Sequence, residues 1–268
     1  MFPGVDGFHW TAGHLVFLGL FFSVLGTVAA TLATAAIRAG RGCQERLIEQ
    51  LRWTGAFHDL PERDRACRHE LTGEFRHRIC QLKFDCQECE THVKLMTKQS
   101  VQSGDEIIFG MRFPLDRLYH RGHTWARAEA DGTFTIGLDE LGRRLMGEPD
   151  TLELPGIGAR LEVNGTAWHM EKNGARVRLL SPIEGEVLET GDPAQTEWLL
   201  KVKPADTRTT HLLRGAELNA WIRREVEKLQ LVMADGSLAD GGEIVEDVSR
   251  VCPRDQWDRA LAAIFLES

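Results

Sequence analysis

The first strong pattern along the chain is an uninterrupted apolar segment near its N-terminus. Residues 15–37 carry no charged side chain and consist mainly of Leu, Phe, Val and Ala. A helix of that length can cross a hydrocarbon core of about 30 Å, because each residue adds about 1.5 Å. A helix lying on a surface would instead show a polar stripe. The segment therefore predicts one N-terminal transmembrane helix.

The residues that flank this segment predict its orientation. A cleaved signal peptide, the main alternative, begins with basic residues and has a shorter apolar run, whereas no Lys or Arg precedes His14. Basic residues follow the span instead, at Arg38, Arg41, Arg46 and Arg52. By the positive-inside rule, residues 1–14 are expected outside and the rest of the chain in the cytoplasm. We therefore expect a single-pass protein of the inner (cytoplasmic) membrane, with membrane lipid at the Arg group.

Two connecting segments are expected after the span. Residues 38–66 predict a juxtamembrane helix, because Leu47, Ile48 and Leu51 have the spacing of an amphipathic helix. Residues 98–116 are polar and then interrupted by turn-forming residues, which predicts a linker.

From residue 117 onward, short runs of alternating apolar and polar residues replace the helical pattern. Gly, Pro and Asn-Gly turns separate the runs, which is typical of short strands. The clearest pair is a β-hairpin of residues 166–170 and 175–180, whose polar tip at 171–174 contains an Asn-Gly pair. The other predicted strands are residues 124–130, 133–138, 151–154, 159–163, 185–190 and 198–202. So many short strands predict a small β-sandwich or barrel.

Helical spacing returns in three places. Residues 139–146 predict a short helix with Asp139 as its N-cap and Gly147 at its end. Residues 210–232 have apolar side chains at the spacing of an amphipathic helix, and residues 254–266 predict a final helix. The predicted fold class is α+β, with a folded domain at 117–232 and a helical tail at 233–268.

Charge and composition exclude some classes of function. The net charge is −8 over 268 residues and no long basic block occurs, so no nucleic-acid partner is expected. No constellation of nucleophile, base and oxyanion hole is visible, so we assign no catalytic residue and do not predict an enzyme.

His120 and His123 lie close together in the sequence. Without a visible carboxylate partner they are interpreted as structural residues.

Four of the six cysteines fall in one polar segment, residues 67–97. Cys67, Cys80, Cys86 and Cys89 have the spacing C-x12-C-x5-C-x2-C, and its final C-x2-C pair can bind one metal. A segment with so few apolar residues can gain folding free energy from a metal. We therefore predict one metal centre on these four cysteines. Zinc and an iron–sulfur cluster both fit four thiolates, and free thiols are the alternative.

Residues 120–229 contain a series of motifs that resembles the H protein of the glycine cleavage system. The motifs are Gly122-His123-Thr124-Trp125, Gly137-Leu138-Asp139, Leu145-Met146-Gly147, Leu154-Pro155-Gly156-Ile157-Gly158, Ser181-Pro182-Ile183-Glu184-Gly185-Glu186-Val187 and Trp198-Leu199-Leu200-Lys201-Val202. Their order and spacing cover somewhat over a third of the chain. The resemblance implies a lipoyl-type barrel-sandwich hybrid fold with flanking helices, which agrees with the strands predicted from the pattern.

The resemblance also implies where a lipoyl group would be attached. In that family a lysine at the hairpin tip carries the group, seven residues before the Ser of a Ser-Pro pair. Counting back seven residues from Ser181 gives Gly174, which has no side chain to modify. Lys172 lies two residues away and reaches the tip only with a changed turn. The segment between Gly185 and Trp198 also lacks the family's longer insert. We therefore expect no lipoate, with Lys172 as the alternative attachment site.

A second resemblance concerns the cysteine segment. Some longer bacterial H-like proteins join a similar segment to such a domain, and two motifs of this chain match it. They are Cys67-Arg68-His69-Glu70-Leu71-Thr72-Gly73-Glu74 and Phe84-Asp85-Cys86-Gln87-Glu88-Cys89. The similarity favours the metal interpretation and implies no particular activity.

Three functional hypotheses follow from the sequence. The first is a membrane-anchored, non-lipoylated docking or assembly module of a cytoplasm-facing membrane complex, such as a redox complex, with the other subunits of that complex as partners. The second is a lipoyl carrier that uses Lys172 to shuttle acyl or aminomethyl groups. The third is an electron-transfer subunit with an iron–sulfur cluster on the four cysteines.

Overall fold

The computed structural model describes residues 11–95, 104–233 and 244–266. The chain divides into two units, Met1–Ile48 and Glu49–Ser268, which are described separately. Residues 1–10, most of the segment predicted to lie outside the membrane, are not among the described residues. The cysteine segment, the predicted H-like domain and the predicted tail all belong to the second unit.

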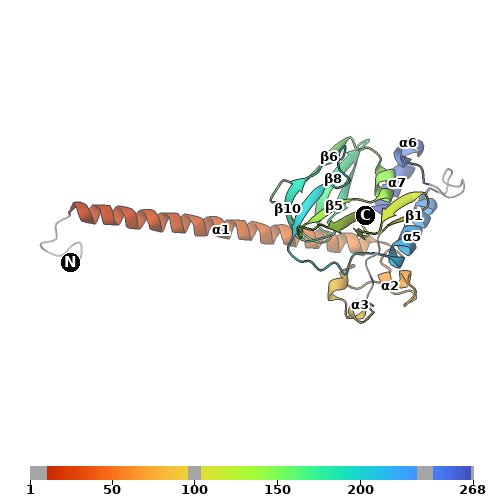
Figure 1. Ribbon diagram of the computed structural model, residues 1–268, viewed down its shortest axis with the longest axis horizontal. Coiled ribbons are helices and arrows are strands. Elements are labelled where there is room, and N and C mark those ends of the chain that lie inside the picture. The colour runs from red at the N-terminus through yellow and green to blue at the C-terminus, as the bar shows by residue number, and fades with distance from the viewer. Residues whose placement is uncertain (1–10, 96–103, 234–243, 267–268) are drawn as a thin grey trace. The chain divides into compact units, whose positions relative to one another are not determined.

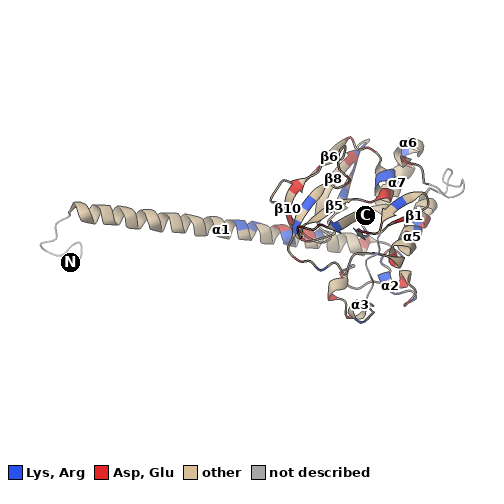
Figure 2. Ribbon diagram, viewed as in Figure 1, with Lys and Arg blue, Asp and Glu red and all other residues tan. Residues whose placement is uncertain are grey.

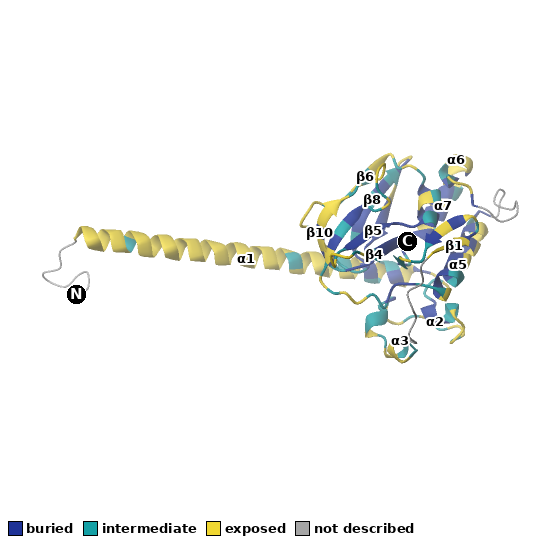
Figure 3. Ribbon diagram, viewed as in Figure 1, coloured by how far each residue is buried: buried dark blue, intermediate teal, exposed yellow. Residues whose placement is uncertain are grey.

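Helix α1 (Ala12–Asp59) is continuous through the predicted span and most of the predicted juxtamembrane helix. It ends at Asp59, short of residue 66, because Leu60 precedes Pro61 and a residue before proline disfavours helical backbone. Within the described residues, α1 is the one helix long and apolar enough to cross a membrane by length and composition. Its apolar side chains between Leu15 and Ile37 are exposed, and its first charged residue is Arg38 (Figures 2 and 3).

Two antiparallel sheets form the frame of the second unit (Figure 1). The larger has six strands in the order β3-β4-β5-β11-β10-β7, and the smaller has three in the order β6-β8-β9. The six strands are β3 (Leu118–Tyr119), β4 (Thr124–Ala128), β5 (Phe134–Leu138), β7 (Arg160–Leu161), β10 (Gly185–Thr190) and β11 (Leu200–Pro204). The three are β6 (Thr151–Glu153), β8 (Thr166–Lys172) and β9 (Ala175–Leu180). Eight of these nine strands occur where the alternating pattern predicts them, with bounds shifted by a few residues, and β3 was not predicted.

The β8–β9 hairpin has a shorter tip than the sequence analysis predicts. Strand pairing continues through Glu171 and ends with Lys172 opposite Ala175, so only Asn173 and Gly174 form the turn. Both turn residues have positive φ, 51° and 78°, which is the requirement of a type I′ hairpin turn. Lys172 is therefore the last residue of a strand and not part of a flexible tip.

Part of the predicted linker at 98–116 is folded. From Asp105 onward it forms a hairpin of β1 (Asp105–Ile108) and β2 (Met111–Pro114). Residues 98–103 of the predicted linker lie outside the described residues. Ile108, Met111 and Phe113 are buried in the main core. The linker prediction is wrong over this hairpin, because turn residues at both of its ends masked two short strands.

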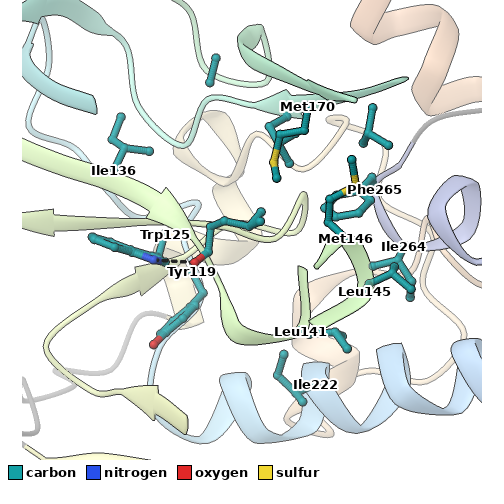
Figure 4. Close-up of a cluster of buried hydrophobic side chains, with 14 of the residues drawn as sticks. Tyr119, Trp125, Ile136, Leu141, Leu145, Met146, Met170, Ile222, Ile264 and Phe265 are labelled. Carbon is teal, nitrogen blue, oxygen red and sulfur yellow. Dashed lines mark hydrogen bonds between the residues drawn. The ribbon is translucent and has the colours of Figure 1, made fainter. Parts of the chain in front are cut away.

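Four helices outside the cysteine segment share one hydrophobic core with the sheets (Figure 4). They are α4 (Glu140–Met146), α5 (Ala216–Val232), α6 (Val248–Val251) and α7 (Arg254–Ile264). Asp139 caps α4 by accepting a hydrogen bond from the Gly142 amide at 2.8 Å, as predicted. Trp257 of α7 is buried and donates to the Leu145 carbonyl at 2.8 Å. The predicted tail is therefore, over its described residues, a packed part of the domain.

The cysteine segment folds as a small lobe with little regular structure. It contains α2 (Arg68–Leu71), the 3-10 helix η1 (Cys86–Glu88) and α3 (Glu90–Leu95). A second hydrophobic cluster joins this lobe to the rest of the unit. Its buried members are Trp53, Phe57, Leu60, Phe84, Leu180 and Leu266.

Candidate functional site

The tip of the β8–β9 hairpin places Gly174 and Lys172 in contrasting surroundings. Gly174 is exposed, and no heavy atom lies within 4 Å of the position that a Cβ would occupy. A side chain there would reach solvent freely, but glycine provides none. The side chain of Lys172, which directly precedes the turn, is only 9% exposed.

The ammonium group of Lys172 is held by the C-terminal part of the chain. Its Nζ donates to Asp247 Oδ2 at 3.2 Å. Burial tends to raise the pKa of Asp247, but hydrogen bonds from Ser249 and Lys172 outweigh it, so that the pKa is lowered and the carboxylate form favoured. Gly147 makes room for this pair, because a Cβ there would lie 2.5 Å from the Asp247 carboxylate.

Two further contacts fix the turn itself. The Asn173 amide donates to Asp150 Oδ2 at 2.6 Å, and the guanidinium of Arg254 donates to the Asn173 carbonyl. Asp247 and Arg254 belong to the C-terminal segment and Asp150 precedes β6. The hairpin tip is therefore held from two sides, and Lys172 cannot swing outward without breaking its ion pair.

The four predicted metal ligands line a single cavity of about 220 Å³. Cys67 and Cys80 lie on two paired segments, joined by the bridge between Ala66 and Ile79. Cys86 begins η1, and the Cys89 amide donates to the Cys86 carbonyl at 3.3 Å. In the described part of the chain, no three His, Cys, Asp or Glu side chains are close enough together to hold one ion. The structure thus gathers the four thiols without bringing them to single-ion distances.

Charged side chains of both signs surround these thiols. Arg68, Arg78 and Arg121 line the cavity, as do Asp85, Glu88 and Glu90. Burial raises the pKa of the Cys86 thiol, although the Arg68 and Arg121 guanidinium groups act in the opposite direction. Arg68 and Arg78 are close to Cys67 and Cys80 in the sequence, whereas Arg121 is distant from all four cysteines and could not be assigned to the cavity from the sequence.

Arg68 also attaches the cysteine lobe to α5. Its Nε donates to Glu217 Oε1 at 2.8 Å and its Nη2 to the Leu212 carbonyl at 3.0 Å. Both charged side chains are buried, at 4% and 6% exposure. The lobe is thus fixed to the H-like domain by a buried, multiply hydrogen-bonded ion pair.

The histidine pair predicted to be structural is buried, and one member has a carboxylate partner that the sequence analysis missed. His123 Nδ1 lies 2.9 Å from Asp139 Oδ2, and both side chains are 0% exposed. Burial lowers the pKa of His123, but Asp139 and Glu225 outweigh it and raise the pKa to about 9. Burial lowers the pKa of His120 to about 3. Because neither ring reaches solvent, this geometry provides an internal ion pair and no catalytic acid or base.

Comparison with known proteins matches the region that contains the hairpin tip and the buried histidines. The family described as glycine cleavage H-protein matches residues 117–225. The H protein of Ralstonia nicotianae is 30% identical over 115 residues, which are 39% of this chain and 91% of that protein. H protein 2 of Pseudomonas syringae pv. tomato is 34% identical over 103 residues, 34% of this chain and 80% of that protein. These matches confirm the predicted H-protein-like domain of β-sheets and helices.

A solved structure was also found to be similar. The crystal structure of a glycine cleavage system H protein from Mycobacterium marinum has 22% sequence identity to this chain, with a TM-score of 0.36. The match covers 42% of this chain and 99% of that one.

Proposed function

We propose that this chain, which belongs to the glycine cleavage H-protein family, is a membrane-anchored docking or assembly module and not a lipoyl carrier. It joins the other subunits of a membrane complex on its cytoplasmic side, and we favour a redox complex. The observation that carries the proposal is the hairpin tip. A carrier needs a lysine on a mobile, exposed tip, whereas here the exposed residue is Gly174 and the nearby Lys172 is ion-paired inside the fold.

The first part of α1 supports the proposed anchor. No residue is buried along the predicted span, whereas the core helix of a water-soluble domain buries one face. The basic residues after Ile37 favour an orientation in which residues 49–268 are cytoplasmic. No catalytic residue is assigned, because the buried histidines and the ion-paired Lys172 offer no accessible nucleophile or base.

The docking role predicts stable partners that do not depend on Lys172. We expect the full chain, purified in detergent from its native membranes, to copurify with a fixed set of subunits. We expect the Lys172→Met variant to retain them within about twofold, because Met preserves most of the aliphatic bulk and Asp247 keeps its contacts with Arg250 and Ser249. The measurement is quantitative mass spectrometry of the copurified proteins. A chain that runs alone, without stable partners, would overturn the proposal.

The carrier hypothesis, unlike the docking role, requires a lipoyl group on Lys172. One feature favours the carrier hypothesis, namely the position of this lysine directly before the turn. We expect the intact mass of the wild-type chain to show no lipoyl increment in cells with active lipoate ligase, because the ammonium is buried against Asp247. The matched variant is Gly174→Lys, which places a lysine at the exposed tip. A lipoyl increment on Lys172 of the wild type would establish the carrier role instead.

A further inference from the structure

We propose that the cysteine cavity binds an iron–sulfur cluster on Cys67, Cys80, Cys86 and Cys89, and not a single zinc ion. The proposal is independent of the docking role. It rests on the spacing of the thiols, the size of the cavity, the hydrogen-bond donors that reach the sulfurs and the charge around them.

Cys67 and Cys80 enter the cavity from one face of a short antiparallel ladder. Ala66 and Ile79 are directly opposite in an antiparallel bridge, and the Cys67 and Cys80 amides donate to the Arg78 and Arg65 carbonyls, both at 2.7 Å. Cys67 and Cys80 therefore share the face opposite to Ala66 and Ile79 and are diagonal neighbours, with backbone positions roughly 7–8 Å apart. Two thiols on one face at this backbone spacing can each bind a different iron atom of one cluster.

The cavity has the size and lining that a cluster requires. All four thiols line one volume of about 220 Å³. In a [4Fe–4S] cluster each of the four thiolates binds a different iron, so the ligands stand further apart than around a single ion. This explains why the four cysteines converge on one cavity although the described residues contain no group tight enough for a single ion. The C-x2-C pair on η1 supplies two ligands from one side and the bridge supplies two from the other.

Hydrogen-bond donors reach three of the four sulfurs. The Phe84 amide donates to Cys80 Sγ at 3.3 Å. The Cys67 thiol accepts from the His69 amide, and the Cys86 thiol accepts from the Arg68 side chain. Such donors stabilise bound thiolates and are one means by which proteins set the reduction potential of a cluster.

Three basic side chains on the cavity wall can offset the charge of an anionic group, and the acidic Asp85, Glu88 and Glu90 line the same wall. A cluster on four thiolates is negatively charged, and each thiol loses its proton on binding. The Arg121 guanidinium lies on the Phe84 ring at 4.1 Å from its centroid, and its Nη2 is buried with no hydrogen-bond partner among the described residues. Arg68 and Arg78 line the same cavity. Arg121 therefore has donor capacity and charge that a bound cluster would use.

The test is anaerobic purification of the full chain in detergent, followed by iron, acid-labile sulfide and zinc analysis and visible absorption. We expect about four iron and four sulfide per chain and a coloured protein. The Cys80→Ser variant should lose most of the iron, while Cys43→Ser, which changes an exposed cysteine, should keep it. A colourless protein with one zinc per chain would overturn the proposal. So would a protein that takes up no cluster when ferrous iron and sulfide are supplied.

A second variant keeps the test valid if Cys80→Ser fails to fold. We expect Arg121→Gln to bind the cluster but to shift its reduction potential to a more negative value, because a positive charge beside the cluster favours the added electron. Redox titration followed by electron paramagnetic resonance measures the shift. An unchanged potential would mean that Arg121 does not face the bound group. Cluster content is measured without reference to partners. Failure of the cluster proposal and failure of the docking role are therefore distinguishable.

Discussion

Replacing Glu217 by Ala is expected to lower the free energy of unfolding by about 3–5 kcal/mol, because the substitution leaves a buried arginine without a counter-charge. Arg68 would keep backbone carbonyl acceptors, among them that of Leu212 at 3.0 Å, but lose both carboxylate contacts. Denaturant unfolding of the detergent-solubilised full chain, followed by tryptophan fluorescence, measures the change.

A surface ion pair provides the matched control for Glu217→Ala. Glu153 on β6 and Arg176 on β9 lie on either side of β8, with side chains that are 50% and 52% exposed. We expect Glu153→Ala to cost about 0.2–1 kcal/mol, since solvent screens exposed pairs. Equal losses for the two variants would show that the Arg68 contact does not fix the cysteine lobe. A larger loss for Glu217→Ala, with faster proteolysis of residues 67–95, would show that it does.

The sequence was most informative where structure is local. Asp139 caps α4 and Gly147 ends it, and Asn173-Gly174 turns the hairpin, because each of these effects involves neighbouring residues. The β1–β2 hairpin was missed for the same reason. Its strands are four residues each, too short for alternation to outweigh the glycine and proline around them. The local pattern thus predicts helices and strands well when cap or turn residues mark their ends. It predicts them poorly when the strand between two turns is very short.

The candidate sites show a similar division. Counting residues back from Ser181 placed Gly174 at the tip of the hairpin. This worked because the pairing of two strands joined by a short turn is set by the number of residues between them. The Lys172–Asp247 pair joins residues 75 positions apart, and nothing in the polar segment around Asp247 indicates which strand it will contact. Likewise the C-x2-C spacing identified the thiols but not Arg121, which enters the cavity from the beginning of the H-like domain. Contacts of this kind are decided by tertiary packing.

The buried His123–Asp139 pair makes the stability of the domain depend on pH. We expect the domain to lose stability as pH rises from about 6.5 to 9. The folded pKa of His123 is raised to about 9 from an ordinary value of 6.5, so its stabilising contribution is complete below pH 6.5 and disappears as pH passes the folded pKa. A difference of this size corresponds to roughly 3 kcal/mol. Unfolding measured at a series of pH values should show the loss.

Two variants separate this effect from other titrations. His123→Asn should be less stable at neutral pH, because Asp139 stays buried without a cation, but its alkaline loss should be nearly absent. His120→Gln should keep the alkaline loss and weaken the acid one. The pKa of His120 is lowered to about 3 by burial, so its unfolded form takes up a proton first as pH falls below 6.5. An alkaline loss that persists in His123→Asn would show that a group other than His123 is responsible.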